Sequence, residues 1–409
     1  MKKVPFLILF SFAVTYALAQ WSLVSPAPTT RDLYSVHFPV PNVGFIVGDT
    51  GAILKTSDSG TTWQKQTSGT SVVLKSVWFI NIETGYVVGD SGIILKTING
   101  GTTWNQLQSG TTKNLNSVRF TDLQTGYIVG DSGTLMKTEN GGITWTSNHG
   151  YSKKLTSVFF VTADTGFVTG YDGIIIKTVD GGQNWLAQYS GTSREVRSVF
   201  FTDSNNGIAV VILSGYIIDD ESSLIKTYDG GTTWNPIGYA PNPLITSIFF
   251  TDASTGYMTG QVRYRQTGLI LKTTYSGLRW DTTNVGQVPT LSSVFFTDAN
   301  TGYAVGSSGT ILKTTNGGIY SIKEVASPQT YFTINPNPAN DKICITNSSN
   351  LTVETKVSIC SLQGVKLIGD TFHDQHRIEM DVSILTPGIY LIKLQTVHGI
   401  ECKKLVIQK

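Results

Sequence analysis

From residue 21 to about residue 318, apolar residues occur in short runs of four to six residues, and the runs are bounded by Gly, Asp, Asn or Ser. Runs of that length are too short for helices, and the bounding residues favour turns, so the pattern predicts β-strands. Four such runs recur in a fixed order, which gives four predicted strands, A to D, in each repeated unit. The expected fold class is therefore all-β.

Two landmarks mark every unit. Strand A carries Ser-Val/Ile-x-Phe, and its serine occurs at Ser35, Ser76, Ser117, Ser157, Ser198, Ser247 and Ser293. Strand C ends in Lys-Thr, with the lysine at Lys55, Lys96, Lys137, Lys177, Lys226, Lys272 and Lys313. The serines are separated by 41, 41, 40, 41, 49 and 46 residues. Four short strands at this spacing are typical of one blade of a β-propeller.

The Gly-rich turn before strand D ends in Trp in six units, but the seventh turn has Ser321 at the equivalent position. Trp21 precedes Ser35 by 14 residues, which matches the 13 residues between Trp63 and Ser76. An open solenoid would instead need capping repeats at its ends. We therefore expect a seven-bladed β-propeller over residues 20–320, closed by its N-terminal strand.

The first residues have the pattern of a secretory signal peptide. Lys2 and Lys3 precede an apolar stretch over residues 4–14, and Ala17-Leu18-Ala19 provides a small-residue cleavage pattern. A transmembrane anchor needs about 20 apolar residues, and this run is shorter. Residues 1–19 are thus expected to be removed, and no other segment is apolar and long enough to span a membrane.

The formal net charge of +2 comes from Lys2 and Lys3, so the mature chain is balanced. A balanced chain does not favour nucleic acid as a partner, because nucleic-acid binders normally carry a strongly basic surface. All three cysteines lie in the last quarter of the sequence, where at most one disulfide could form.

The turn from Thr56 to Trp63 resembles an Asp box, the Ser/Thr-x-Asp-x-Gly-x-x-Trp element of sialidase-like propellers. Asp or Asn at its third position can accept backbone N–H bonds within the turn, and one carboxylate per turn is too few for a Ca²⁺ site. With the other landmarks, residues 21–318 are similar to the photosystem II stability and assembly factor-like propeller family. That resemblance implies the fold firmly. It also implies, more weakly, an assembly or scaffolding role like that of the photosynthetic members.

The repeat stops near residue 331, after a predicted linker over residues 321–331. Residues 332–409 contain Asn335-Pro336-Asn337-Pro338-Ala339, Gly388-Ile389-Tyr390 and a terminal Lys-Leu-Val-Ile-Gln-Lys. These motifs resemble the type A C-terminal sorting domain of the type IX secretion system. The resemblance implies a small antiparallel β-sandwich, recognition by type IX machinery, and a protein secreted or displayed on the outer surface of a Gram-negative bacterium.

No catalytic pattern stands out. A sialidase needs an Arg cluster, a Tyr nucleophile backed by a carboxylate, and an acid/base Asp, and no three Arg residues occupy equivalent positions. His37 and His149, the propeller histidines, are far apart in repeat phase, so neither a metal cluster nor a Ser-His-Asp triad is indicated. We expect no enzyme activity, no cofactor and no metal, with a glycosidase as the least unfavourable enzyme class.

If strand A is innermost, the D-to-A connections and the B-to-C turns share one face. The D-to-A segments are basic, and the B-to-C turns carry Asp49, Asp90, Asp131 and Asp172. We therefore predict a basic inner rim with an acidic periphery. The longer repeat spacings place insertions over residues 212–223 and 261–267 on the same face. Loop Arg and Tyr on a rigid scaffold favour binding, and the predicted site is Lys153, Lys154, Arg194, Arg197, Tyr216, Arg263, Tyr264 and Arg265.

The sequence thus predicts a secreted, non-catalytic protein that binds a protein or glycan partner on this face. Two alternatives stay open: a scaffold or assembly factor like the photosynthetic relatives, and a glycosidase.

Overall fold

The structure is a computed structural model that divides the chain into two compact units, residues 1–321 and 322–409. It describes residues 21–148, 150–213, 221–239, 243–262, 267–283, 285–318, 332–347, 355–361, 366–373, 377–396 and 399–409. The predicted signal peptide, residues 1–19, and the predicted linker, residues 321–331, lie outside these ranges. Within these ranges, no helix is long and apolar enough to cross a membrane.

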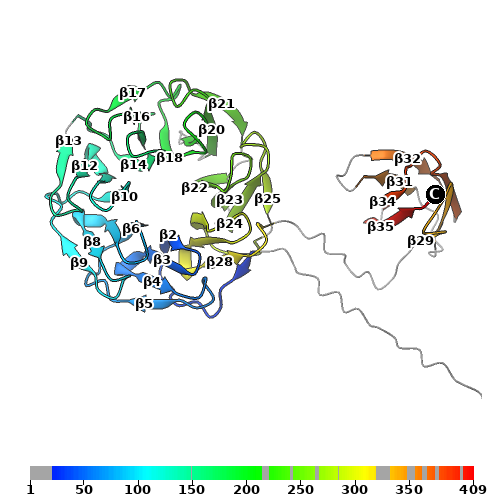
Figure 1. Ribbon diagram of the computed structural model, residues 1–409, viewed down its shortest axis with the longest axis horizontal. Helices are drawn as coiled ribbons and strands as arrows, with labels where there is room; N and C mark the ends of the chain where they lie inside the picture. Colours follow the sequence, from blue (N-terminus) through cyan, green and yellow to red (C-terminus); the bar gives the residue numbers. More distant parts are fainter. Residues whose placement is uncertain are drawn as a thin grey trace, which may run out of the picture. The chain divides into compact units, whose positions relative to one another are not determined.

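The described residues of the first unit form seven four-stranded antiparallel sheets and contain no α-helix. Figure 1 shows the sheets arranged in a circle, each running from the centre outward. We number them 1 to 7 along the chain, starting from the sheet that contains β2. The prediction of an all-β fold with four strands per repeat is confirmed.

The predicted strands A are innermost in the circle (Figure 1). They are β2 (Leu33–Val40), β6 (Leu74–Phe79), β10 (Leu115–Phe120), β14 (Leu155–Phe160), β18 (Glu195–Phe201), β22 (Pro243–Phe250) and β26 (Leu291–Phe296). Strands B follow as β3 (Val43–Gly48), β7 (Gly85–Gly89), β11 (Gly126–Gly130), β15 (Gly166–Gly170), β19 (Gly207–Leu213), β23 (Gly256–Val262) and β27 (Gly302–Gly306).

Strands C are β4 (Ile53–Thr56), β8 (Ile94–Thr97), β12 (Leu135–Thr138), β16 (Ile175–Thr178), β20 (Glu221–Thr227), β24 (Thr267–Thr273) and β28 (Ile311–Thr314). The outermost strands are β5 (Gln64–Gln66), β9 (Asn105–Leu107), β13 (Thr146–Asn148), β17 (Leu186–Gln188), β21 (Asn235–Tyr239), β25 (Asp281–Thr283) and, in sheet 7, β1 (Ser22–Leu23). Four B-to-C turns are short 3-10 segments: η1 (Asp49–Gly51), η2 (Asp90–Gly92), η3 (Asp131–Gly133) and η4 (Ser307–Gly309).

Aromatic side chains join neighbouring sheets. The Tyr86 ring of strand B stacks on Phe120 of the next strand A at 3.8 Å between centroids, and its hydroxyl donates a 2.8 Å hydrogen bond to the carbonyl of Gly141. The same stack recurs for Phe45 on Phe79, Tyr127 on Phe160, Phe167 on Phe201, Tyr257 on Phe296 and Tyr303 on Phe38. The last pair joins sheet 7 to sheet 1.

These stacks explain the Gly that precedes each strand B aromatic residue. A Cβ added at Gly85 would lie 2.5 Å from the Phe79 ring, closer than any side chain tolerates. The landmark residues of the repeat are therefore required by contacts between strands.

The turn before each strand D is held by its own side chains. In the first turn Asp58 accepts hydrogen bonds from the Thr62 amide at 2.9 Å, the Thr62 hydroxyl at 2.6 Å and the Thr56 hydroxyl at 2.8 Å. The bonds from Thr62, with smaller contributions from Thr56 and Thr61, lower the pKa of the Asp58 carboxyl to about 2. Such a carboxylate stabilises its turn.

Trp21 fills the corresponding Trp position in sheet 7. Its side chain is 4% exposed and meets the rings of Tyr257 and Phe296 edge-on, at 6.5 and 5.7 Å between centroids. The adjacent strand β1 pairs with β28, with Ser22 opposite Lys313 and Leu23 opposite Leu312.

The second unit consists of two antiparallel sheets that share one hydrophobic core. One sheet contains β29 (Phe332–Asn335), β30 (Lys342–Asn347) and β33 (Arg377–Asp381), and the other contains β32 (Lys366–Phe372), β31 (Thr355–Cys360), β34 (Gly388–Thr396) and β35 (Gly399–Ile407). Burial alternates along β31, where Val357 and Ile359 are buried and Lys356 is exposed. Cys344, Cys360 and Cys402 are free thiols.

Candidate functional site

Each innermost strand contains a β-bulge near its start. The register with strand B skips one residue there, and the skipped residues are Tyr34, Lys75, Asn116, Thr156, Arg197, Thr246 and Ser292. A bulge redirects the side chain of its extra residue. Because every sheet has its bulge at the equivalent position, we call these seven residues the bulge positions.

Six of the bulge positions line one cavity of about 610 Å³. Val73, Asp90, Lys154, Tyr171 and Glu195 complete the lining. The lining therefore comes from the starts of the innermost strands and from the D-to-A and B-to-C segments beside them. This is the face on which the sequence predicts binding, and we call this space the bulge cavity.

The charged groups of the bulge cavity are engaged in ion pairs. Lys75 forms an ion pair with Asp90, and Arg197 donates from Nε and Nη2 to the two carboxylate oxygens of Glu195 at 2.9 and 3.2 Å. Lys154 is held more loosely, with Nζ 4.0 Å from Asp131. The predicted basic rim and acidic periphery thus meet as ion pairs, and they do not form two separate zones.

Two tyrosines add aromatic surface to the lining. Burial, with a contribution from Asp32, raises the pKa of the Tyr34 phenol, and burial together with Glu195 raises that of Tyr171. The Lys154 ammonium lies 5.5 Å from the centre of the Tyr171 ring. Both phenols stay protonated at neutral pH and can donate hydrogen bonds.

The structure brings two of the predicted site residues, Lys154 and Arg197, into the bulge cavity. Lys153 lies beside it and pairs with Asp172 at 2.7 Å, and the exposed side chain of Arg194 follows in the next D-to-A segment. Tyr216, Arg263, Tyr264 and Arg265 lie outside the described residues. These four residues fall between the paired strands of two long hairpins, because β19 pairs with β20, and β23 with β24, over seven positions each.

Nine of the eleven lining residues are absent from the predicted site: Tyr34, Val73, Lys75, Asp90, Asn116, Thr156, Tyr171, Glu195 and Thr246. Five of them are bulge positions, each directly before the serine of Ser-Val/Ile-x-Phe. The sequence signal that could have identified them is a fixed position of the repeat at which the residue type varies.

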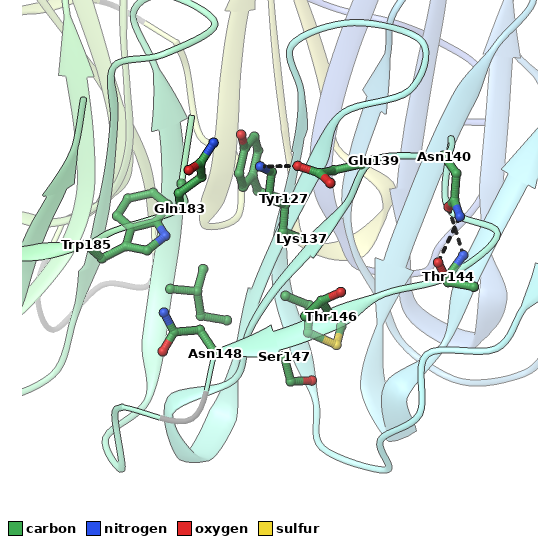
Figure 2. Close-up of a pocket in the computed structure, with 13 residues that line it drawn as sticks. Tyr127, Lys137, Glu139, Asn140, Thr144, Thr146, Ser147, Asn148, Gln183 and Trp185 are labelled. Atoms are coloured by element: carbon green, nitrogen blue, oxygen red, sulfur yellow. Dashed lines mark hydrogen bonds and ion pairs between the residues drawn. The ribbon is translucent and has the colours of Figure 1, made fainter. Parts of the chain in front are cut away.

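A second cavity, of about 640 Å³, lies between sheets 3 and 4 (Figure 2). In sheet 2 the lysine that ends strand C donates to the next turn, from Lys96 Nζ to the Gly141 carbonyl at 2.7 Å. Lys137 of sheet 3 instead pairs with Glu139 at 2.6 Å, as the dashed line in Figure 2 shows. Trp185 and polar groups of β13 line the remaining walls. No predicted site residue lies here, and only two sheets contribute.

Among the described residues, no group of three or more His, Cys, Asp or Glu side chains is placed to hold a metal ion. Chemically, the bulge cavity offers hydroxyl, amide and phenol hydrogen-bonding groups around internally paired charges. Such a lining suits the recognition of a polar partner.

Two family models match the chain. Residues 14–112 and 102–190 match the family described as Photosynthesis system II assembly factor YCF48, and residues 333–408 match the secretion system C-terminal sorting domain. No curated protein matches the chain. The sorting domain indicates secretion through the type IX system to the cell surface or the outside, as the sequence predicts.

Solved structures match 72% of the chain or more. YCF48 bound to a D1 peptide is 19% identical, with 72% of this chain and 97% of that chain covered and a TM-score of 0.59. YCF48 from Cyanidioschyzon merolae is 20% identical, with 72% and 98% covered and a TM-score of 0.60. An ancestral GH74 enzyme is 13% identical, with 94% and 63% covered and a TM-score of 0.57. The chain therefore combines a propeller-like unit with repeats of the photosystem II assembly factor type and a C-terminal secretion system sorting domain.

Proposed function

We propose that the chain is a secreted, non-catalytic binding protein that recognises a protein or glycan partner at the bulge cavity. In this proposal the first unit is a seven-bladed β-propeller closed by its N-terminal strand and the second is a β-sandwich. A signal peptide takes the chain across the inner membrane, and the sorting domain takes it through the type IX system to the cell surface.

Three contacts between the two ends of the first unit support closure. Strand β1 pairs with β28, strand β2 packs against β26, and Tyr303 of sheet 7 stacks on Phe38 of sheet 1 at 4.1 Å. The Tyr303 hydroxyl also donates to the Ser59 carbonyl at 2.6 Å. A rigid ring holds its central residues in fixed positions, which favours preorganised binding.

The observation that carries the binding proposal is the convergence of six bulge positions on one cavity. Five residue types occupy these six positions, with Thr in both sheet 4 and sheet 6, although the surrounding strand residues repeat closely. A scaffold that repeats its core while varying one inward position presents an asymmetric surface to a partner.

The charge pairing supports a non-catalytic role. Both carboxylates of the lining, Asp90 and Glu195, are engaged by Lys75 and Arg197. A glycosidase needs one carboxyl free to donate a proton and a second group able to attack. The raised pKa of Tyr171 opposes its use as a nucleophile.

An assembly or scaffolding role is the second candidate. The matched repeats and the similarity to YCF48 with a bound D1 peptide favour it, because that relative binds a polypeptide. A protein ligand would be compatible with either role, whereas a glycan ligand would favour the first.

A triple variant, Lys154→Ala, Tyr171→Ala and Arg197→Gln, should lose at least about tenfold in affinity, because Tyr and Arg dominate binding energies in central, desolvated pockets. Gln at position 197 can still donate to Glu195, which limits the loss of stability. The mature chain would be screened against a glycan array and purified surface proteins of the producing organism. The dissociation constant of each ligand found would be measured by calorimetry.

The matched control replaces exposed residues of the outer strands and turns: Lys65→Ala, Tyr275→Ala and Arg279→Ala. It should bind like the wild type. Unchanged affinity in the first variant would place the site elsewhere, and turnover of any arrayed glycan would contradict the non-catalytic role.

A further inference from the structure

The x residue of each Ser-Val/Ile-x-Phe motif belongs to a continuous circle of side chains, which we call the inner ring. Its members are His37, Trp78, Arg119, Phe159, Phe200, Phe249 and Phe295. His37 lies 4.2 Å from Trp78, and Arg119 lies 3.7 Å from Trp78 and 5.2 Å from Phe159, measured to ring centres. The three later contacts between phenylalanines span 5.1 to 5.4 Å, and Phe295 returns to His37 at 5.1 Å.

Solvent reaches the inner ring. All members except His37, which is 6% exposed, are partly exposed, although they project from the innermost strands. Six of the seven members are aromatic, so the inner ring presents a mostly apolar surface.

Arg119 is the one charged member at neutral pH. Burial lowers the pKa of its guanidinium to about 10, so the group still carries its charge. Among the described residues it has no ion pair and no hydrogen bond, and its guanidinium contacts the rings of Trp78 and Phe159. Cation–π contact offsets part of the desolvation cost of a guanidinium but leaves its N–H donors unused.

The neighbours of Arg119 do not supply the missing acceptor. The Nδ1 of His37 accepts a hydrogen bond from the Phe79 amide at 3.3 Å, and burial and Arg119 lower the pKa of this imidazole to about 3. His37 is therefore neutral, with its proton on Nε2. The Trp78 indole N–H already donates to the Phe120 carbonyl at 3.1 Å. Among the described residues no acceptor of the chain bonds to the guanidinium, so its N–H donors are open to solvent or to a ligand.

We propose that the inner ring binds a carboxylate attached to an aromatic or apolar body. The carboxylate would accept two hydrogen bonds from the planar guanidinium of Arg119, and the body would lie against the phenylalanine rings. A dianion such as phosphate fits less well, because a single cation in apolar surroundings cannot offset its desolvation. The ligand is either a small free acid or the C-terminal residue of a peptide. This site lies three residues beyond the bulge positions on the same strands and is separate from the proposed partner site.

The test uses the full mature chain and four probes, measured by calorimetry and by Trp fluorescence: phenylacetate, a hexapeptide ending in Phe, the same peptide with a C-terminal amide, and inorganic phosphate. Saturable binding of phenylacetate or of the free-acid peptide is expected. Tighter binding of phenylacetate would identify a small free acid as the source of the carboxylate, and tighter binding of the peptide would identify a C-terminal residue. The amide should bind at least about tenfold more weakly, because it cannot form the charged pair.

Arg119→Phe gives sheet 3 the same residue that sheets 4 to 7 have at this position, so the inner ring should stay packed. Affinity for the acid probes should fall at least about tenfold. Arg119→Gln provides a second variant if the first does not fold, and melting temperatures check both. The triple variant of the bulge cavity should bind these probes like the wild type. No saturable binding of either acid, equal binding by Arg119→Phe, or phosphate binding as tight as that of the acids would each overturn the proposal.

Discussion

Trp21→Ala should destabilise the first unit by about 3–5 kcal/mol, the usual cost of truncating a buried Trp. The indole is almost fully buried against Tyr257 and Phe296, and a Cβ added at Gly318 would lie 2.7 Å from its Nε1. Removal of the indole leaves a cavity in a core to which both ends of the first unit contribute residues. Chemical unfolding of the mature chain, followed by circular dichroism, measures the loss.

Trp63→Ala is the matched control, because Trp63 is 8% exposed and its indole N–H likewise lacks a hydrogen-bond partner. Both substitutions should lower stability by similar amounts. Hydrogen exchange should separate them: Trp21→Ala should expose the pairing of β1 with β28, whereas Trp63→Ala should expose the core between sheets 1 and 7. A clear loss for Trp63→Ala beside no change for Trp21→Ala would mean that the N-terminal strand does not close the ring.

Most of the strand pattern could be predicted from the sequence, because each landmark residue makes a specific contact in the fold. Gly85 precedes Tyr86 because the Phe79 ring occupies the space of a Cβ, and Tyr86 is aromatic because it stacks on Phe120. The assignment of Trp21 to the last sheet rested on the same regularity, since a missing Trp in the seventh turn needed a substitute from elsewhere in the chain.

The bulge cavity was less accessible to sequence reasoning. In an uninterrupted strand successive side chains alternate between faces, and that rule does not show that a bulge redirects Asn116 or Thr156. Charge counts along the D-to-A and B-to-C segments gave the sign of each segment but not the partner of each group. Lys75 and Asp90 are 15 positions apart in sequence, and only the return of strand B brings them together.

The inner ring is a second feature that the sequence alone did not predict. The x residue of the strand A motif is Phe in four sheets, and its residue type alone does not indicate a binding site. The functional interest of Arg119 depends on what surrounds it, because an arginine with a carboxylate neighbour would be an ordinary ion pair. The absence of such a neighbour among the described residues became visible only in the folded ring.

Deletion of residues 331–409 should abolish export of the chain, with the remaining protein retained in the periplasm. The deleted segment contains the whole match to the secretion system sorting domain, while the described strands of the first unit all end before it. Fractionation of cells that express the full and truncated chains, followed by protease treatment of intact cells, measures surface display. The truncated chain should be resistant in intact cells and still folded after release.

A pair of point variants tests whether recognition requires the folded unit. Leu405 is fully buried in the core of the second unit, so Leu405→Asp places an unpaired charge there and should unfold it. Ile384 is 76% exposed, and Ile384→Asp should leave the unit intact. We expect Leu405→Asp to block export as the deletion does and Ile384→Asp to preserve it. Surface display of the truncated chain at the normal level would contradict the role of the second unit in sorting.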